Sequence, residues 1–145
     1  MYETLVEFLP MLSGSKYGEW VTYPGHAGTR EDPLIFPWVK YDKCILGLCK
    51  AVYLFVDEHR ELDLRSYEEI LGKSGIKWNL DSMSNADVSV LDGTTVMALL
   101  VATVRAERFC DGALLQLCNN GSIAKWLERL KEIDEERELF DNSDT

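Results

Sequence analysis

The chain has 145 residues, 46% of them hydrophobic and 10% aromatic, with a formal net charge of −10 and a pI near 4.6. This length and composition are typical of a single folded domain and exclude wholesale disorder. The acidic balance argues against general binding to nucleic acid or to anionic membranes. Half of the net charge lies in residues 134–145, which carry six acids and one arginine, so the rest of the chain is only mildly acidic.

The first predicted elements are a short helix and a β ribbon. Apolar residues recur at helical spacing over residues 3–12, with Pro10 expected to end or kink that helix. Aromatic and β-branched residues predict a strand over 19–23 and a returning strand over 34–39. Pro37 restricts the second strand to a sheet edge. We expect the ribbon to lean on the helices, because two strands alone are only marginally stable.

Five aromatic side chains gather along this ribbon: Trp20, Tyr23, Phe36, Trp38 and Tyr41. Two interpretations stay open, since these side chains could pack the ribbon onto the helices or line a groove that binds a partner. His26 lies between glycines with no nucleophile or carboxylate at a recognisable spacing, so we expect a solvated loop histidine rather than a general base. Trp20, Trp38 and Tyr41 are therefore the candidate binding residues of this region.

Helical periodicity continues through the middle of the chain. A helix is expected over residues 41–58 with Asp42 as its N-cap, and a shorter one over residues 64–71. Residues 81–85 look like a polar segment, and residues 87–91 like a single turn before the next helix. These segments indicate a helical domain, whose core we expect to form around the most apolar element of the chain.

The most apolar stretch runs from Asp92 to Gly121. Asp92 is expected to cap a helix, and residues 95–103 are apolar on nearly every side, which is typical of a helix inside a core. A buried strand is the alternative because of the valines, but the length of the run favours helix. The run is too short and too interrupted to span a membrane. Gly112 either kinks one long helix or separates it from a second one.

The last helix is predicted from Ser122, as its cap, to about Leu139. Its apolar stripe has a period of 3.6 residues: Ile123, Trp126, Leu127, Leu130 and Ile133. Residues 141–145 are expected to fray as an acidic tail, leaving residues 1–140 as a single globular domain. The predicted fold class is mainly α (α+β): a helical domain around a buried central helix at about 92–110, with a small β ribbon or extended aromatic segment near 18–40.

A charged cluster ends the central helix: Arg105, Glu107, Arg108 and Asp111. At helical spacing Arg105 and Arg108 share a face, as do Arg108 and Asp111. The arginines could form a structural network pinned by Glu107, Asp111 or backbone carbonyls, or one of them could bind a carboxylate or phosphate in a forked geometry. All four are candidate binding residues. Adjacent arginines would hold the two acids ionised, which is unsuitable for a general acid.

Motifs of known chemistry are missing from the sequence, which has no GxGxxG, GxxxxGK[ST], GxSxG or HExxH pattern. The four cysteines form no CxxC pair and the two histidines lie at no ligand spacing, so we predict reduced thiols, no metal and no cofactor. The N-terminal residues carry acids and no basic region, which is unlike a signal peptide and favours a cytoplasmic protein. No catalytic residue can be named, and the balance is against an enzyme.

Two segments, VRAERFCDG at Val104–Gly112 and WLERLKE at Trp126–Glu132, resemble a family of small uncharacterised bacterial and mobile-element proteins. That family is marked by V-R-A-E-R-F-C-x-G and a following W/I-L-x-R-L-K-E helix. Gly18–Trp20 and Trp78–Met83 are also similar to it. The resemblance implies that Arg105, Glu107 and Arg108 are marked positions, and it implies a prokaryotic or phage setting, but it implies no activity.

Three functions follow as hypotheses. The first is a small cytosolic binding or regulatory protein that acts through protein–protein or small-anion contacts. The second is an unrecognised enzyme or ligand-binding domain in which Arg105 or Arg108 holds an anionic ligand. The third is an acidic nucleic-acid mimic from a mobile element, which requires carboxylates spaced along one face like phosphates. A protein partner is expected, without direct contact to nucleic acid or membrane, and the sequence leaves the oligomeric state open.

Overall fold

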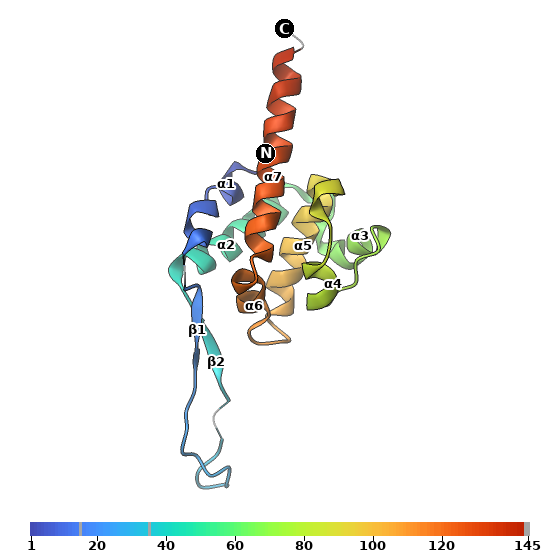
Figure 1. Cartoon of the computed structure of the whole chain (residues 1–145). Helices are drawn as coiled ribbons and strands as arrows, with labels where there is room; N and C mark the ends of the chain where they lie inside the picture. The colour runs from blue at the N-terminus through green and yellow to red at the C-terminus, as the bar shows by residue number, and fades with distance from the viewer. Residues whose placement is uncertain (15, 35, 144–145) are drawn as a thin grey trace.

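The computed structural model describes residues 1–14, 16–34 and 36–143. Within that part of the chain lie seven α-helices and one two-stranded sheet, and the structure is 62% helical. Figure 1 shows a helical body with a hairpin arm on one side and the end of the last helix projecting on the other. The predicted class, mainly α with a small β ribbon, is confirmed.

The helices are α1 (Glu3–Val6), α2 (Lys43–Glu58), α3 (Tyr67–Lys73), α4 (Leu80–Ser84), α5 (Gly93–Ala106), α6 (Ala113–Asn119) and α7 (Ser122–Ser143). The strands are β1 (Gly18–Val21) and β2 (Trp38–Tyr41). Single 3₁₀ turns occupy Leu9–Ser13, Arg60–Leu62, Leu64–Ser66 and Val88–Val90.

Helix α5 lies at the centre of the body. Its Asp92 cap accepts hydrogen bonds from the Thr95 backbone N–H at 2.8 Å and from the Thr95 hydroxyl at 2.7 Å. Its middle is buried on all sides, where it packs against α2, α3, α6 and α7. The prediction of a buried central helix, rather than a strand, is therefore confirmed. The helix ends at Ala106 instead of residue 110, and Gly112, with φ of +91°, separates it from α6.

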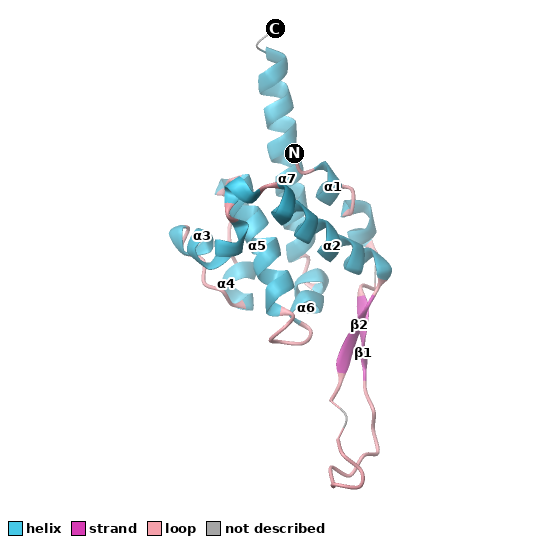
Figure 2. Cartoon of the chain, turned by 180° about the vertical axis from the view of Figure 1, so that it is seen from behind, coloured by secondary structure: helices cyan, strands magenta, loops and turns pink. Residues whose placement is uncertain are grey.

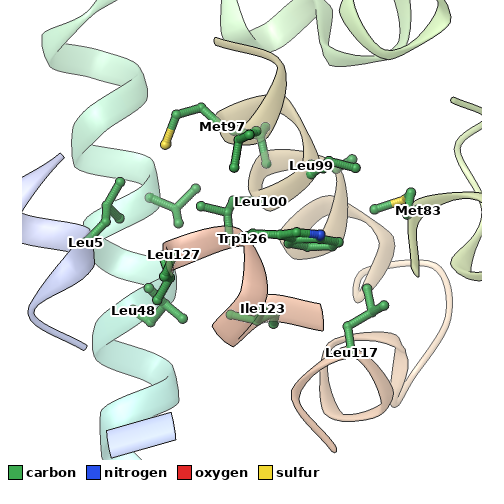
Figure 3. Close-up of a cluster of buried hydrophobic side chains, with 14 of the residues drawn as sticks. Leu5, Leu48, Met83, Met97, Leu99, Leu100, Leu117, Ile123, Trp126 and Leu127 are labelled. Carbon is green, nitrogen blue, oxygen red and sulfur yellow. The ribbon is translucent and has the colours of Figure 1, made fainter. Parts of the chain in front are cut away.

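Helix α7 supplies the other half of the core. Trp126 is fully buried, and Figure 3 shows it among the labelled side chains of α5 and α7. Among the described residues, the Trp126 Nε1–H is the one buried side-chain polar atom without a hydrogen-bond partner. The predicted Ser122 cap is wrong by one residue, because Gly121 contributes the first accepting carbonyl and the Asn120 side chain accepts from the Ser122 N–H.

Several predicted boundaries also change. The helix expected over residues 3–12 divides into α1 and a 3₁₀ turn, because Pro10 fits the first turn of a new helix better than the interior of an old one. Residues 81–85, expected to be a polar segment, belong largely to α4, since the Asn79 side chain caps it at 2.7 Å from the Ser82 N–H. Asp42 occupies the N-cap position of α2 but accepts from the Cys44 thiol instead of from a backbone N–H.

The arm consists of residues 16–41 and extends from the body in both views (Figures 1 and 2). Its strands are antiparallel, with Gly18 opposite Tyr41 and Val21 opposite Trp38. The returning strand predicted from residue 34 begins only at Trp38, directly after Pro37, which could not donate to the ladder. Leu34 and Phe36 precede the strand, and Ile35 lies outside the described residues.

The end of α7 leaves the body on the side away from the arm (Figures 1 and 2). Asp134 ties this helix to the N-terminus, since its carboxylate accepts from the Tyr2 backbone N–H at 2.8 Å and from the N-terminal ammonium at 3.2 Å, and the Arg137 guanidinium donates to the Met1 sulfur at 3.6 Å. Beyond it the helix continues to Ser143, past the predicted end near Leu139, and every side chain from 135 to 141 is exposed. Residues 144 and 145 of the predicted tail lie outside the described residues.

Candidate functional site

The strand register directs alternate residues of the arm toward the body. Trp20 is paired with Val39, so both lie on one face of the ribbon together with Tyr41, while Trp38 lies on the other face. Val39 is buried, and the Trp20 ring lies against Gly112. A Cβ atom at Gly112 would lie 2.5 Å from Trp20 Cζ2, and the positive φ there also favours glycine. The arm therefore meets the body at the turn between α5 and α6.

Glu107 is the centre of this junction. Its Oε1 accepts from the Tyr41 hydroxyl at 2.6 Å and from the Leu114 N–H at 2.9 Å, and its Oε2 accepts from the Gly112 N–H at 3.0 Å. The Tyr41 oxygen in turn accepts from the Leu115 N–H at 3.1 Å. The first N–H groups of a helix have no partner within the helix, and a carboxylate there also suits the helix dipole. Glu107 and Tyr41 together cap α6 and attach the arm to it.

The junction combines the Glu107 carboxylate with a hydroxyl and two thiols that stay protonated, those of Tyr41, Cys49 and Cys118. Burial, and then the hydrogen bond to Glu107, raise the pKa of Tyr41 above its usual value. Burial raises the pKa of Cys49 to about 11 and that of Cys118 to about 12, with a smaller contribution from the Glu107 charge in both cases. Thiols of this kind are protonated near neutral pH and are poor nucleophiles. The junction is thus built to hold two parts of the fold together.

The two arginines of the cluster do not take part in it. Arg105 is half-buried and Arg108 is exposed, and the guanidinium group of neither forms an ion pair or hydrogen bond with another described residue. The structural network that the sequence allowed is absent there, because Glu107 points to α6 and Tyr41 instead. Asp111 is exposed on the turn and lines a hollow beside Trp20. Neither guanidinium group therefore belongs to the junction.

A groove opens beside these arginines, between α4, the end of α5 and the start of α6. It has a volume of about 330 Å³ and is mostly apolar, and we call it the aromatic groove; it is lined by Trp78, Asn79, Leu80, Met83, Ala106, Phe109, Cys110 and Ala113. Phe109 is 81% exposed, and its ring meets Trp78 edge-on with centroids 6.3 Å apart. Trp78 is fixed by its Nε1–H, which donates to the Ala102 carbonyl at 3.0 Å.

The structure brings together residues of the aromatic ribbon and of the charged cluster, which the sequence analysis treated as separate groups. Trp20, Tyr41 and Glu107 meet at the arm junction, with Asp111 beside them. Trp38 lies apart on the outer face, where its Nε1–H donates to the Tyr23 hydroxyl at 3.2 Å. Sequence reasoning missed Trp78 and Phe109 as surface residues. No local signal marks Phe109 as exposed, because an aromatic residue that follows an apolar helix could equally enter the core.

The expectation for His26 is corrected in one respect. A carboxylate partner does exist, since His26 Nδ1 lies 2.7 Å from Asp32 Oδ1. The hydrogen bond with His26, and then that from the Ala27 N–H, lower the pKa of Asp32. The Asp32 carbonyl also accepts from the Gly28 and Thr29 N–H groups. These contacts close the loop of the arm upon itself.

No group of three or more His, Cys, Asp or Glu side chains that could hold a metal ion occurs among the described residues. Over the same residues, no helix combines the length and the apolar character needed to cross a membrane.

Comparison with known proteins finds one match, to a family of unknown function (DUF6508), over residues 72–136. This is less than half of the chain, and it includes α4, α5, α6 and most of α7 but not the arm. It contains Val104–Gly112, Trp78–Met83 and Trp126–Glu132, but not Gly18–Trp20. Neither the curated proteins nor the solved structures searched gave a match. The matched family has no known function, so this similarity assigns no activity.

Proposed function

We propose that this chain is a small cytoplasmic binding or regulatory protein, of prokaryotic or phage origin, which contacts a partner protein through its arm. The observation that carries this proposal is the outer surface of the arm. Four large apolar side chains beyond the junction are exposed: Tyr23, Leu34, Phe36 and Trp38. Phe36 alone is 82% exposed.

The charge of the arm supports the same role. Residues 16–41 carry three basic residues (Lys16, Arg30, Lys40) and three acids (Glu19, Glu31, Asp32), so their net charge is zero. The net charge of −10 therefore belongs to the rest of the chain. Surfaces that bind proteins are enriched in aromatic side chains and depleted of charge at their centre. The arm shares the aromatic enrichment, and its charges of opposite sign cancel.

The junction gives the arm a defined base. Tyr41 is bonded both to Glu107 and to the start of α6, and Trp20 lies against Gly112. Fixing the base of a binding element in advance lowers the ordering cost of association. Glu107 is in this proposal a positioning residue for the arm, not a contact of the partner.

The experiment compares affinity purifications with three baits. The wild type, an arm variant (Tyr23→Ser, Phe36→Ser, Trp38→Ser) and a control variant of exposed residues elsewhere (Met11→Ser, Val90→Ser) are each used with a bacterial lysate at two salt concentrations. We expect a protein that is enriched by the wild type and by the control but lost with the arm variant. A partner retained by the arm variant would contradict a role for the arm.

A second function is favoured by one observation, namely that the Arg105 and Arg108 guanidinium groups have no ion pair among the described residues. An arginine left open suits a carboxylate or phosphate ligand. Thermal melts of the wild type and Arg108→Ala with a panel of anions and nucleotides test it. A ligand that stabilises only the wild type would support this function, and the absence of any shift would remove it.

The mimicry of nucleic acid is supported least. The last acids of α7 in the described chain lie on residues 135–143, which carry four acids and one arginine, a net charge of −3. Nine helical residues span about 13 Å, a length over which duplex DNA carries about eight charges. The negative charge per unit length of this segment is less than half of that of duplex DNA.

A further inference from the structure

We propose that the aromatic groove of one copy of this chain binds the projecting end of α7 from a second copy. The α7 end is defined here as residues 135–143. This contact is separate from the arm and does not depend on the function proposed above.

The α7 end has the chemistry of a ligand for the groove. Its adjacent residues Leu139 and Phe140 are 70% and 68% exposed, although both are large and apolar. Acids surround them, namely Glu135, Glu136, Glu138 and Asp141. A helix with apolar side chains in an acidic setting fits a groove with an apolar floor and a basic edge.

The aromatic groove has that complementary character. Its lining is mostly apolar and its Phe109 ring stands open to solvent. Arg105 precedes Ala106 of the lining directly and stands one helical turn before Phe109, while Arg108 is adjacent to Phe109. Of the two carboxylates on this turn, that of Glu107 is engaged by Tyr41 and the N-terminus of α6, and that of Asp111 lines the separate hollow beside Trp20. The two arginines therefore form a basic edge on an otherwise acidic protein.

The directions of the elements exclude the chain's own α7 end as the occupant of its groove. The α7 end leaves the body on one side, whereas the turn between α5 and α6 lies on the side of the arm (Figures 1 and 2). The α7 end is about 13 Å long as a continuous helix and points away from its own groove. A second copy can receive it head to tail, and such a heterologous contact forms chains unless the rotation closes a ring.

Analytical ultracentrifugation of the purified chain tests the contact over micromolar to millimolar concentrations. We expect the mean mass of the wild type to rise with concentration, and less steeply at high salt because part of the attraction is ionic. A tail variant (Leu139→Ser, Phe140→Ser) and a groove variant (Arg105→Glu, Phe109→Ser) should each self-associate at least about tenfold more weakly. The control variant Met11→Ser, Val90→Ser should behave like the wild type. Circular dichroism confirms that each variant is folded.

Mixing the two defective variants gives the decisive result. The tail variant keeps an intact groove and the groove variant keeps an intact tail, so one contact per pair can still form. We expect a one-to-one complex in the mixture, at concentrations at which each variant alone stays largely monomeric. A wild type that stays monomeric, an association that neither variant weakens, or a mixture without a complex would each overturn the proposal.

The arm variant separates this inference from the proposed function. It should self-associate like the wild type, because the arm has no part in the contact. Loss of self-association in the arm variant, with the tail variant unaffected, would instead place the interface between copies on the arm and overturn the groove.

Discussion

Trp126 lies in the core between α5 and α7, and Trp38 lies in the arm. Both regions are rich in large apolar and aromatic residues. The core between α5 and α7 leaves Trp126 fully buried, whereas the outer face of the arm leaves Trp38 44% exposed. Four helices pack around α5, whereas the ribbon meets the helical body with its inner face, and its outer face carries the contact of Trp38 with Tyr23 of the arm itself. Burial of an apolar side chain is favourable in free energy wherever the residue lies in the chain. Only the tertiary structure decides whether other residues of the same chain bury it.

The largest expected effect is the difference in stability between alanine substitutions of these two tryptophans. Trp126→Ala should lower the free energy of unfolding by about 3–5 kcal/mol, since it empties a large volume in the centre of the core. Trp38→Ala should change it by about 0.5 kcal/mol or less. Urea unfolding measures both. Equal losses would mean that the arm is part of the cooperative core.

Trp126→Phe sharpens the first result. The indole N–H has no hydrogen-bond partner among the described residues, so this substitution removes an unsatisfied donor together with part of a ring. Its cost should be well below that of Trp126→Ala, and a cost as large would indicate that the N–H does have a partner in solution.

The next effect tests the junction between the two regions. Gly112→Ala should cost about 2–4 kcal/mol, from the left-handed backbone and from contact with Trp20. Gly75→Ala is the matched control, because its φ is +73° but no atom lies within 4 Å of the added Cβ, and it should cost about 1–2 kcal/mol.

A Trp20→Ala background then isolates the contact with the arm. In that background the cost of Gly112→Ala should fall to that of Gly75→Ala, as measured by urea unfolding of all four variants. An unchanged cost would show that the Trp20 ring does not lie on Gly112 in solution.

Tyr41→Phe should cost about 1–3 kcal/mol, because it removes the donor to Glu107 and the acceptor for the Leu115 N–H. The pKa of Tyr41 is raised in the folded chain, so this stabilisation is complete below the unfolded value of about 10 and declines as the pH rises above it. The stability difference between wild type and Tyr41→Phe should therefore shrink from pH 9 to pH 11.

Denaturation at a series of pH values measures that trend. The Cys49 and Cys118 thiols also lose stabilisation in alkali, but they do so equally in both proteins and cancel in the difference. A difference that stays constant or grows with pH would rule out the hydrogen bond as its source.

The smallest effect belongs to the outermost part of the arm. Phe36→Ser should alter the free energy of unfolding by less than about 0.5 kcal/mol, because the ring is almost fully exposed in the monomer. Urea unfolding measures it, with Val90→Ser as a control at another exposed apolar position. A larger loss for Phe36→Ser would show that the ring packs against the chain itself.

Local sequence signals predicted much of the fold. The all-round apolar run after Asp92 placed α5, and the 3.6-residue stripe placed α7, because these patterns are satisfied only by helices with a core on one or all sides. The errors fall where a short element depends on a single cap. Asn79 begins α4 within a segment that otherwise looks like a polar loop, and Gly121 takes the capping position expected of Ser122.

The candidate site was only partly predictable. Glu107 and Tyr41 were both named, but 66 positions separate them in the chain, and no spacing rule joins residues so far apart. The pairing of Glu107 with neighbouring arginines looked favourable locally, yet the unpaired N–H groups of α6 and the Tyr41 hydroxyl compete for the same carboxylate and win. Phe109 was passed over because an aromatic residue after an apolar helix is indistinguishable from a core residue until its surroundings are known.

The sequence by itself determined the longer helices, the ribbon, the capping residue of α5 and the absence of familiar catalytic motifs, since each depends on neighbours within a few positions. Only the tertiary structure decided that Glu107 holds the arm, that Arg105 and Arg108 are left open beside an aromatic groove, and that the end of α7 projects with Leu139 and Phe140 exposed. These features depend on which distant surfaces meet, and burial and hydrogen bonding across such surfaces are settled by packing.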